Sequence, residues 1–208
     1  MRGHKLQFWL TEGMPKLQFV TAHSIQYQFQ TRISMTPVEC TRQWVEKFII
    51  KLNICPFARR ELRKNSIYFH ESPAKKIVDG LADLLIEIRR LESRTDIETT
   101  LLIFPHMLHQ FFDYLDFVDL AEQLIVQEGL EGIFQVASFH PDYCFADAEM
   151  DDVANYTNRS PFPMLHLLRE ASLEQAIDNY GDTSTIPENN IRRLRELGLD
   201  EVKKIMLS

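Results

Sequence analysis

The sequence predicts an α/β domain with a core of about three strands connected by helices. Short apolar runs suited to buried strands alternate with longer segments in which apolar residues recur at helical spacing. Helices of that length between strands favour right-handed parallel crossovers over hairpins. The expected β-α-β-α-β core has flanking helices and a helical C-terminal part. A ferredoxin-like α+β arrangement is the main alternative, because helical connections also occur between antiparallel strands.

The first expected helix begins at Thr36. The segment Thr36-Pro37-Val38-Glu39 combines an N-cap hydroxyl, a proline at N1 and a glutamate at N3 that can reach back to the cap. Apolar residues at helical spacing extend this helix to about Asn53. A short helix opened by Pro56 follows, and Ile67-Tyr68-Phe69 is the first expected strand.

Two helix–strand units complete the expected core. A helix opened by Ser72-Pro73 leads to the second strand, Leu101–Phe104. A further helix ends at Gly129, where a left-handed residue costs little, and leads to the third strand, Ile133–Phe139.

Three more helices are expected after Asp151. Their start signals are Ser160-Pro161, the capping box Ser172-Leu173-Glu174-Gln175, and Thr185-Ile186-Pro187-Glu188, and Gly198 breaks the last of them. We expect these helices to pack over the sheet or its edge. Because no long linker divides residues 35–208, we expect that range to be a single domain.

Residues 1–34 differ from the rest of the chain. They are rich in glutamine and aromatic residues, repeat the tetrapeptide Lys-Leu-Gln-Phe, and show no sustained period. We expect a non-domain extension produced by a mis-assigned start, with Met35 as the initiator directly before the first helix. A transit peptide is the alternative, because the segment is basic and lacks the apolar core of a secretory signal.

Composition and charge restrict the possible partners. The apolar runs are far shorter than the roughly 20 residues that cross a bilayer, so no membrane partner is expected. The formal net charge is −7, and residues 35–208 hold 19 basic and 29 acidic residues. A chain this acidic repels a phosphate backbone, so nucleic-acid binding is not expected. Three scattered cysteines, Cys40, Cys55 and Cys144, indicate reduced thiols in the cytoplasm.

Polar residues follow the third expected strand directly. His140 is biased toward extended geometry by Pro141, and Asp142 and Tyr143 come next. In parallel α/β sheets, ligands bind beyond the carboxyl ends of strands, which makes this a candidate site. The alternative is a turn in which Asp142 caps local backbone and His140 lies on the surface.

A second polar group surrounds the expected helix start at Ser160. The guanidinium of Arg159 and the free N–H groups of a helix N-terminus together would suit a phosphate or carboxylate. His166 and Glu170, four residues apart, would share one face of that helix. The candidate ligand-binding residues are Tyr143, Asn155, Tyr156, Asn158, Arg159, Ser160, His166 and Arg169. A capped amphipathic helix with a solvated polar face is the alternative.

Cys55 is the candidate nucleophile. Pro56 places it at the N-cap of a short helix, where the helix dipole lowers a thiol pKa. His140 or His166 could act as its base, with Asp142 orienting His140, so the candidate catalytic residues are Cys55, His140 and Asp142. The alternative is that Cys55 is a small buried hydrophobic residue.

These features are most consistent with a cytoplasmic enzyme that acts on a small anionic metabolite. One alternative is a module that binds a peptide or a phosphorylated metabolite without catalysis. Another is a metal site built from His140, Asp142 and His166, or from the strand-end histidines His70, His106 and His140. The sequence specifies neither a cofactor nor an oligomeric state.

Three long stretches are together similar to the family catalogued as domain of unknown function 1415 (DUF1415). They are NICPFA at 53–58, FQVASFHPDY at 134–143 and NYTNRSPFPMLHLLRE at 155–170. The resemblance covers about residues 36–197, which begins close to Met35. It implies relatives among bacteria and eukaryotes and implies no particular activity, so the functional reading depends on the residues themselves.

Overall fold

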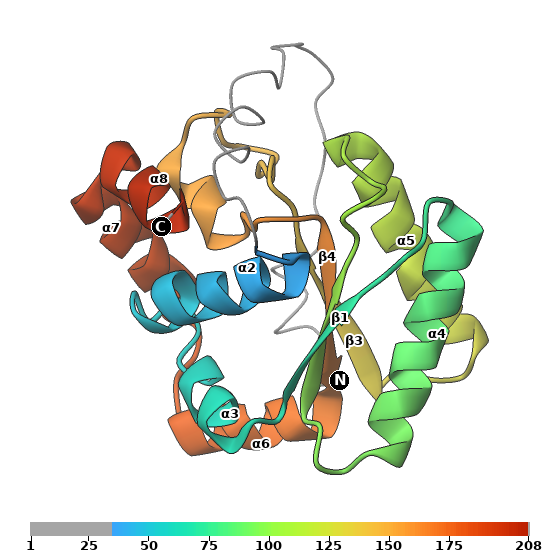
Figure 1. The fold of residues 1–208 in the computed structure, drawn as a ribbon. Coiled ribbons are helices and arrows are strands. Elements are labelled where there is room, and N and C mark those ends of the chain that lie inside the picture. Colours follow the sequence, from blue (N-terminus) through green and yellow to red (C-terminus); the bar gives the residue numbers. More distant parts are fainter. Residues whose placement is uncertain (1–34, 208) are drawn as a thin grey trace.

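The structure, a computed structural model, describes residues 35–207, and the expectation for residues 1–34 lies outside this range. A four-stranded sheet lies between two layers of helices (Figure 1). The strands are β1 (Ile67–Glu71), β2 (Thr99–Ile103), β3 (Phe134–Phe139) and β4 (Met164–Arg169). The helices are α2 (Pro37–Trp44), the π-helix η3 (Val45–Ile50), α3 (Ala58–Lys64), α4 (Ile77–Ser93), α5 (Phe111–Gln127), the 3₁₀-helix η4 (Val153–Thr157), α6 (Glu170–Tyr180), α7 (Ile186–Leu197) and α8 (Leu199–Leu207).

The sheet is mixed, with the strand order β1-β2-β4-β3. β1 and β2 pair in parallel through the α4 crossover, and β4 pairs antiparallel with both β2 and β3. β1, β2 and β3 therefore run in the same direction, which confirms the expected α/β core. The ferredoxin-like alternative is wrong, because β1 and β2 are parallel neighbours.

One expected helix is a strand. Residues after Ser160-Pro161 form β4, which fills the space between β2 and β3. The prolines at 161 and 163 bias the residues before them toward extended geometry. Leu165 and Leu167 point to one face of the sheet and Met164 to the other, the period of two that defines a strand. A short apolar run of this kind does not by itself distinguish a strand from a helix, and the demand for backbone partners between β2 and β3 decided it.

Helix starts follow their local signals only in part. The short helix expected at Pro56 begins at Ala58, with Phe57 and not Cys55 at its N-cap. Thr36 Oγ1 accepts from Glu39 N–H at 3.2 Å and Glu39 Oε2 accepts from Thr36 N–H at 2.7 Å, which confirms the capping box. The helix expected from Ser72-Pro73 begins only at Ile77, because Ser72 Oγ instead binds Ala74 N–H and donates to Asp83. The helix expected from Ser172 begins earlier, at Glu170.

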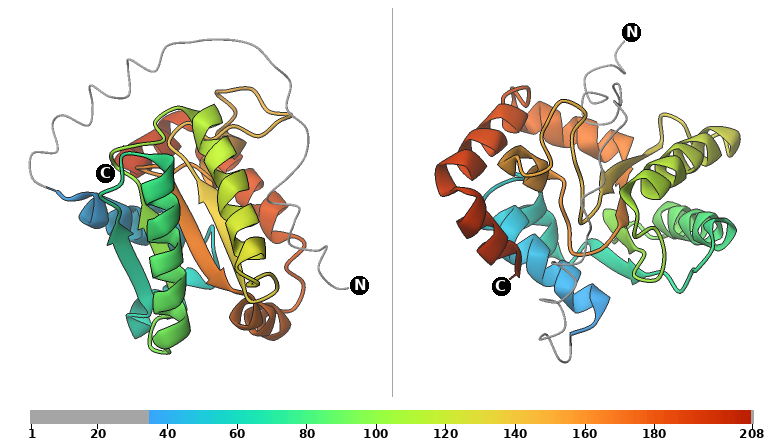
Figure 2. Two further views of the ribbon diagram at one scale, coloured as in Figure 1. Left: turned by 90° about the vertical axis from the view of Figure 1, so that its right-hand side faces the viewer. Right: turned by 90° about the horizontal axis from the view of Figure 1, so that it is seen from above.

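Two clusters of buried side chains pack on the two faces of the sheet. We call the cluster beneath α4 and α5 the α4/α5 layer; it contains Leu84, Ile88, Leu102, Phe117 and Leu165 among others. We call the other the α2/α7 layer; it contains Trp44, Phe48, Leu101, Met164 and Leu194 among others. Figure 2 shows α4 and α5 side by side over one face, with α2, α7 and α8 on the opposite side. No helix within residues 35–207 is long and apolar enough to cross a membrane.

Tyr114 of α5 ties the ends of β3 and β4 together. Its fully buried hydroxyl donates to the carbonyl of Met164 at 2.9 Å and accepts from the N–H of Phe139 at 2.8 Å. Tyr114→Phe leaves both backbone groups without this partner, so we expect the free energy of unfolding to fall by about 2 to 4 kcal/mol. Urea unfolding of the variant measures this, and a loss below about 0.5 kcal/mol would contradict the bridging role.

Candidate functional site

His140 lies at the end of β3 and is fully buried. Its Nε2 donates to the carbonyl of Leu108 at 2.9 Å, because a carbonyl can only accept, and its Nδ1 accepts from the N–H of Asp142 at 3.0 Å. Burial lowers the pKa of His140 to about 4. The ring is therefore neutral at pH 7 with both nitrogens engaged. The backbone of Asp142, and not its expected carboxylate, orients the imidazole.

Aromatic rings enclose His140 on the side of α5. The ring centroids of Tyr114 and Phe111 lie 5.0 and 5.3 Å from that of His140, and Tyr143 packs against Phe111 at 5.3 Å. Burial raises the pKa of Tyr143. His140 and Tyr143 are thus part of the packing between α5 and the chain that leaves β3, and neither the surface turn nor an open catalytic histidine describes this arrangement.

The asparagines of the second polar group organise the connection between β3 and β4. Asn155 accepts from the N–H of Phe145 at 3.0 Å and donates to the carbonyl of Glu149 at 2.8 Å. Asn158 donates to the carbonyl of Ser138 at 3.3 Å. Ser160 donates to the carbonyl of Phe162 at 2.7 Å. These buried side chains therefore compensate backbone groups of the connection itself.

Arg159 is the most unusual group of this segment, because only 7% of its surface is exposed. Its Nε donates to the carbonyl of Tyr143 at 3.1 Å, its Nη2 donates to the carbonyl of Met150 at 2.7 Å, and its Cζ lies 4.6 Å from the centre of the Tyr156 ring. These three contacts hold the guanidinium rigidly across the β3–β4 connection.

The third nitrogen of Arg159 is available. Nη1 makes no hydrogen bond with any residue in 35–207, and Arg159 forms no ion pair within this range. Fully buried side-chain atoms without a hydrogen-bond partner occur in this range only at Gln43, Trp44, Glu98 and Thr100. Nη1 of Arg159 is not one of them, so it retains access to the surface. The neighbouring carboxylate of Asp152 pairs instead with Arg195 at 3.6 Å. The site is thus a nearly buried positive charge that lacks an acidic partner within the described chain.

His166 lies in β4 and not on a helix. It pairs with Leu101 of β2 and Ala137 of β3, and it points toward the same side of the sheet as Met164, into the α2/α7 layer. Its Nε2 is 2.7 Å from Thr99 Oγ1, and burial lowers its pKa to about 4. The expected shared helix face with Glu170 does not exist, because Glu170 starts α6.

Arg169 has a separate structural role. Its Nη2 donates to the carbonyls of Leu91, Arg94 and Ile97, at and beyond the C-terminus of α4. Carbonyl oxygens at a helix C-terminus carry partial negative charge, which balances the guanidinium. Arg169 is therefore separated from Arg159 along β4, and the structure does not bring the two together.

Cys55 packs in the α2/α7 layer, whereas the rings around His140 belong to α5 on the other face. The structure therefore does not pair Cys55 with His140. The expectation of a depressed thiol pKa is wrong: burial raises the pKa of Cys55, and the N–H groups of Phe57 and Ala58 offset this only in part. Desolvation disfavours a thiolate more than a short helix stabilises it.

Neither proposed metal set is assembled. Within residues 35–207, no group of three or more histidine, cysteine or acidic side chains could hold a metal ion. His70 lies 3.5 Å from Glu87 and His106 lies 4.0 Å from Glu71, while His140 is enclosed. The strand-end histidines therefore interact with different neighbours.

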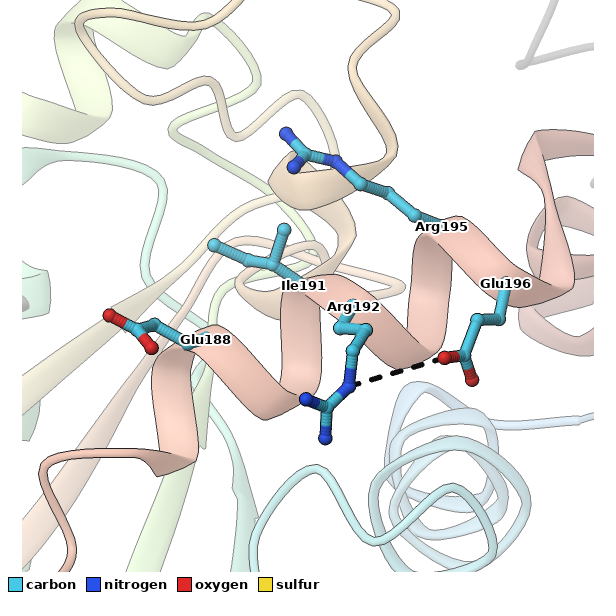
Figure 3. A pocket seen from close by; sticks show the side chains of 5 residues that line it. All are labelled: Glu188, Ile191, Arg192, Arg195 and Glu196. Carbon is cyan, nitrogen blue, oxygen red and sulfur yellow. Dashed lines mark ion pairs between the residues drawn. The ribbon is translucent and has the colours of Figure 1, made fainter.

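A surface hollow runs along α7, a helix that packs against η4. Its lining comprises Glu188, Ile191, Arg192, Arg195 and Glu196 (Figure 3). Arg192 pairs with Glu196 at 4.0 Å, and Arg195 pairs with Asp152. Because these cations already have acidic partners, we do not place the anion site in this hollow.

One residue that local sequence patterns missed is Thr99. Thr99 is buried in β2 and contacts His166 of β4, although the two residues are 67 positions apart in the sequence. A threonine at the start of an apolar strand has no local feature that marks such a role. Only the register of β2 against β4 brings it into contact with the imidazole.

The fold and site define an α/β protein with a mixed sheet and a rigidly held arginine beside the β3–β4 connection, with no acidic partner among residues 35–207. The chain belongs to the family described as "Protein of unknown function (DUF1415)", whose model matches residues 36–204. The match confirms the resemblance of the three sequence stretches. No curated protein and no solved structure matches the chain.

Proposed function

We propose that this chain binds a small metabolite bearing a phosphate or carboxylate group, and that Arg159 recognises it. The observation that carries this proposal is the nearly buried guanidinium whose Nη1 has no partner among the described residues. A buried charge costs free energy unless it is paired. The two carbonyls and the Tyr156 ring offset only part of the desolvation cost of the Arg159 guanidinium, and an anion at Nη1 would offset more of it.

Preorganisation also supports the proposal. Two carbonyls fix Nε and Nη2, so an anion would meet a side chain whose rotamer is already set. Binding then loses little side-chain entropy. Because the chain has a formal net charge of −7, the local positive charge of Arg159 would offset the general repulsion of an anion.

The two expected catalytic side chains His140 and Cys55 do not support catalysis at this site. An enzyme would need a group beside Arg159 that can exchange a proton with the ligand. His140, the expected base, has both ring nitrogens occupied by backbone groups. Cys55 packs on the opposite face and has a raised pKa, so the proposal does not require it. We further propose a cytoplasmic location, which the three free cysteines support.

Anion binding can be tested by thermal unfolding of the full chain with inorganic phosphate, citrate and a panel of sugar phosphates. We expect at least one anion to raise the melting temperature of the wild type. Arg159→Ala should weaken its binding by about 1.5 to 3 kcal/mol, the value of a charge-assisted hydrogen bond.

Because Arg159 also braces the connection, its replacement can lower stability without any ligand. The quantity to compare is therefore the increase in melting temperature that each anion produces over the same variant in anion-free buffer. Arg169→Ala is the matched control, since it removes a second carbonyl-bound arginine and should keep the anion effect. An undiminished effect in Arg159→Ala, or no stabilising anion for the wild type, would refute the proposal.

A further inference from the structure

Thr99 connects the backbone of β4 to the imidazole of His166. Its Oγ1 lies 2.5 Å from the carbonyl oxygen of Leu167 and 2.7 Å from Nε2 of His166. Thr99 itself is buried, with 7% of its surface exposed. The hydroxyl is thus held between two groups of the same neighbouring strand.

The hydroxyl has one hydrogen, and this determines the direction of both bonds. Two oxygens 2.5 Å apart require a proton between them, and the carbonyl of Leu167 can only accept. Thr99 therefore donates to Leu167. Because its hydrogen is used in that bond, the Thr99 hydroxyl can only accept a hydrogen bond from His166. The Nε2 atom of His166 therefore carries the ring hydrogen.

Nδ1 of His166 is then left with an unshared electron pair. No described residue donates to it, and the His166 side chain is partly exposed on the α2/α7 side of the sheet. The Phe139 and His166 rings lie 6.3 Å apart between centroids, and the Phe139 ring packs edge-on against Trp44 at 5.5 Å. Burial lowers the pKa of His166 to about 4, so the ring stays neutral at pH 7.

We infer that Thr99 fixes His166 in its Nε2–H tautomer and that Nδ1 forms a second binding site, which accepts a hydrogen bond from a ligand hydroxyl, ammonium or amide N–H. The chemistry differs from that at Arg159: a neutral accepting nitrogen repels the lone pairs of a fully ionised phosphate or carboxylate. The inference is independent of the proposed anion site. Thr99 acts here as a positioning residue and Nδ1 as the contact to the ligand.

The tautomer can be read directly by ¹⁵N NMR of the histidine side chains in the full chain, with His166→Gln to assign the signals. We expect a pyridine-type Nδ1 and a pyrrole-type Nε2 for His166. Thr99→Val removes the acceptor and keeps the side-chain shape, so the ratio of the Nε2–H to the Nδ1–H form should fall roughly fivefold, and Thr99→Ser should restore it. A pyrrole-type Nδ1 in the wild type, or an unchanged ratio in Thr99→Val, would overturn the inference.

The binding chemistry is tested on the same signals with glycerol, methylammonium chloride and acetamide as hydrogen-bond donors and with sodium sulfate, which has no O–H at neutral pH, as the mismatched probe. A donor should shift the Nδ1 resonance of His166 in a saturable way, and sulfate should not. His140, with both ring nitrogens engaged, is the internal control and should not respond. If no donor shifts Nδ1, or if sulfate alone does, the assignment of a donor-binding site is wrong even where the tautomer holds.

Discussion

Arg90→Leu should lower the free energy of unfolding by about 3 kcal/mol, because it leaves the carboxylate of Glu87 buried without its main partner. Glu87 has no exposed surface, and Arg90 binds both of its oxygens, with Nε–Oε2 at 3.0 Å and Nη2–Oε1 at 3.2 Å. Loss of one member of a buried ion pair commonly costs about 3 to 5 kcal/mol. We choose the lower end because the Arg90 side chain keeps 31% exposure and His70 lies 3.5 Å from Glu87.

The matched control is the double variant Glu87→Leu with Arg90→Leu. It removes the charge that the single variant leaves unpaired, and apolar replacement of a complete buried pair is often neutral or stabilising. We therefore expect the double variant to be more stable than Arg90→Leu in urea unfolding. A double variant that is no more stable than Arg90→Leu would contradict this explanation. The loss would then come from the packing of the Arg90 stem on Tyr68, which both variants lack.

Acidification from pH 7 to pH 5 should destabilise the fold by about 2 kcal/mol for each of His140 and His166. Burial lowers both pKa values from 6.5 to about 4. Below pH 6.5 the unfolded chain therefore binds protons that the folded chain excludes until about pH 4. The stability these neutral rings contribute is present above the unfolded pKa and is lost as the pH falls through this window.

Urea unfolding at half-unit pH steps measures the slope of stability against pH. His166→Gln should reduce that slope by close to one proton between pH 6 and pH 5. An unaltered slope in His166→Gln would mean that the imidazole is protonated in the folded state.

Local patterns predicted the elements whose stabilising contacts are close in sequence. The capping box at Thr36 and the left-handed Gly129 with φ of 70° act within a few residues, so they can be recognised without the fold. The α4 and α5 helices and the three same-direction strands also followed from periodicity. The location of polar residues after β3 was likewise visible, because a strand end followed by His140-Pro141 interrupts an apolar run.

The roles of those polar residues were not visible, because they depend on distant partners. His140 is neutral and closed because α5 and Leu108 enclose it, and Arg159 is anchored by carbonyls at 143 and 150. Cys55 has a raised pKa because the tertiary fold partly desolvates its thiol, an effect that outweighs the adjacent helix start. Burial and its effect on charge are properties of the assembled layers, and no local motif encodes them.

By itself, the sequence determined an α/β chain of the DUF1415 family, its first helix start and the β1, β2 and β3 strands, because propensity, capping and periodicity are short-range effects. Only the tertiary structure decided that 164–169 is a strand and that Thr99 meets His166. A short apolar run such as 164–169 is compatible with either a strand or a helix. The open backbone groups of β2 and β3 selected the strand, because unpaired N–H and C=O groups inside a sheet are too costly to leave exposed to apolar side chains.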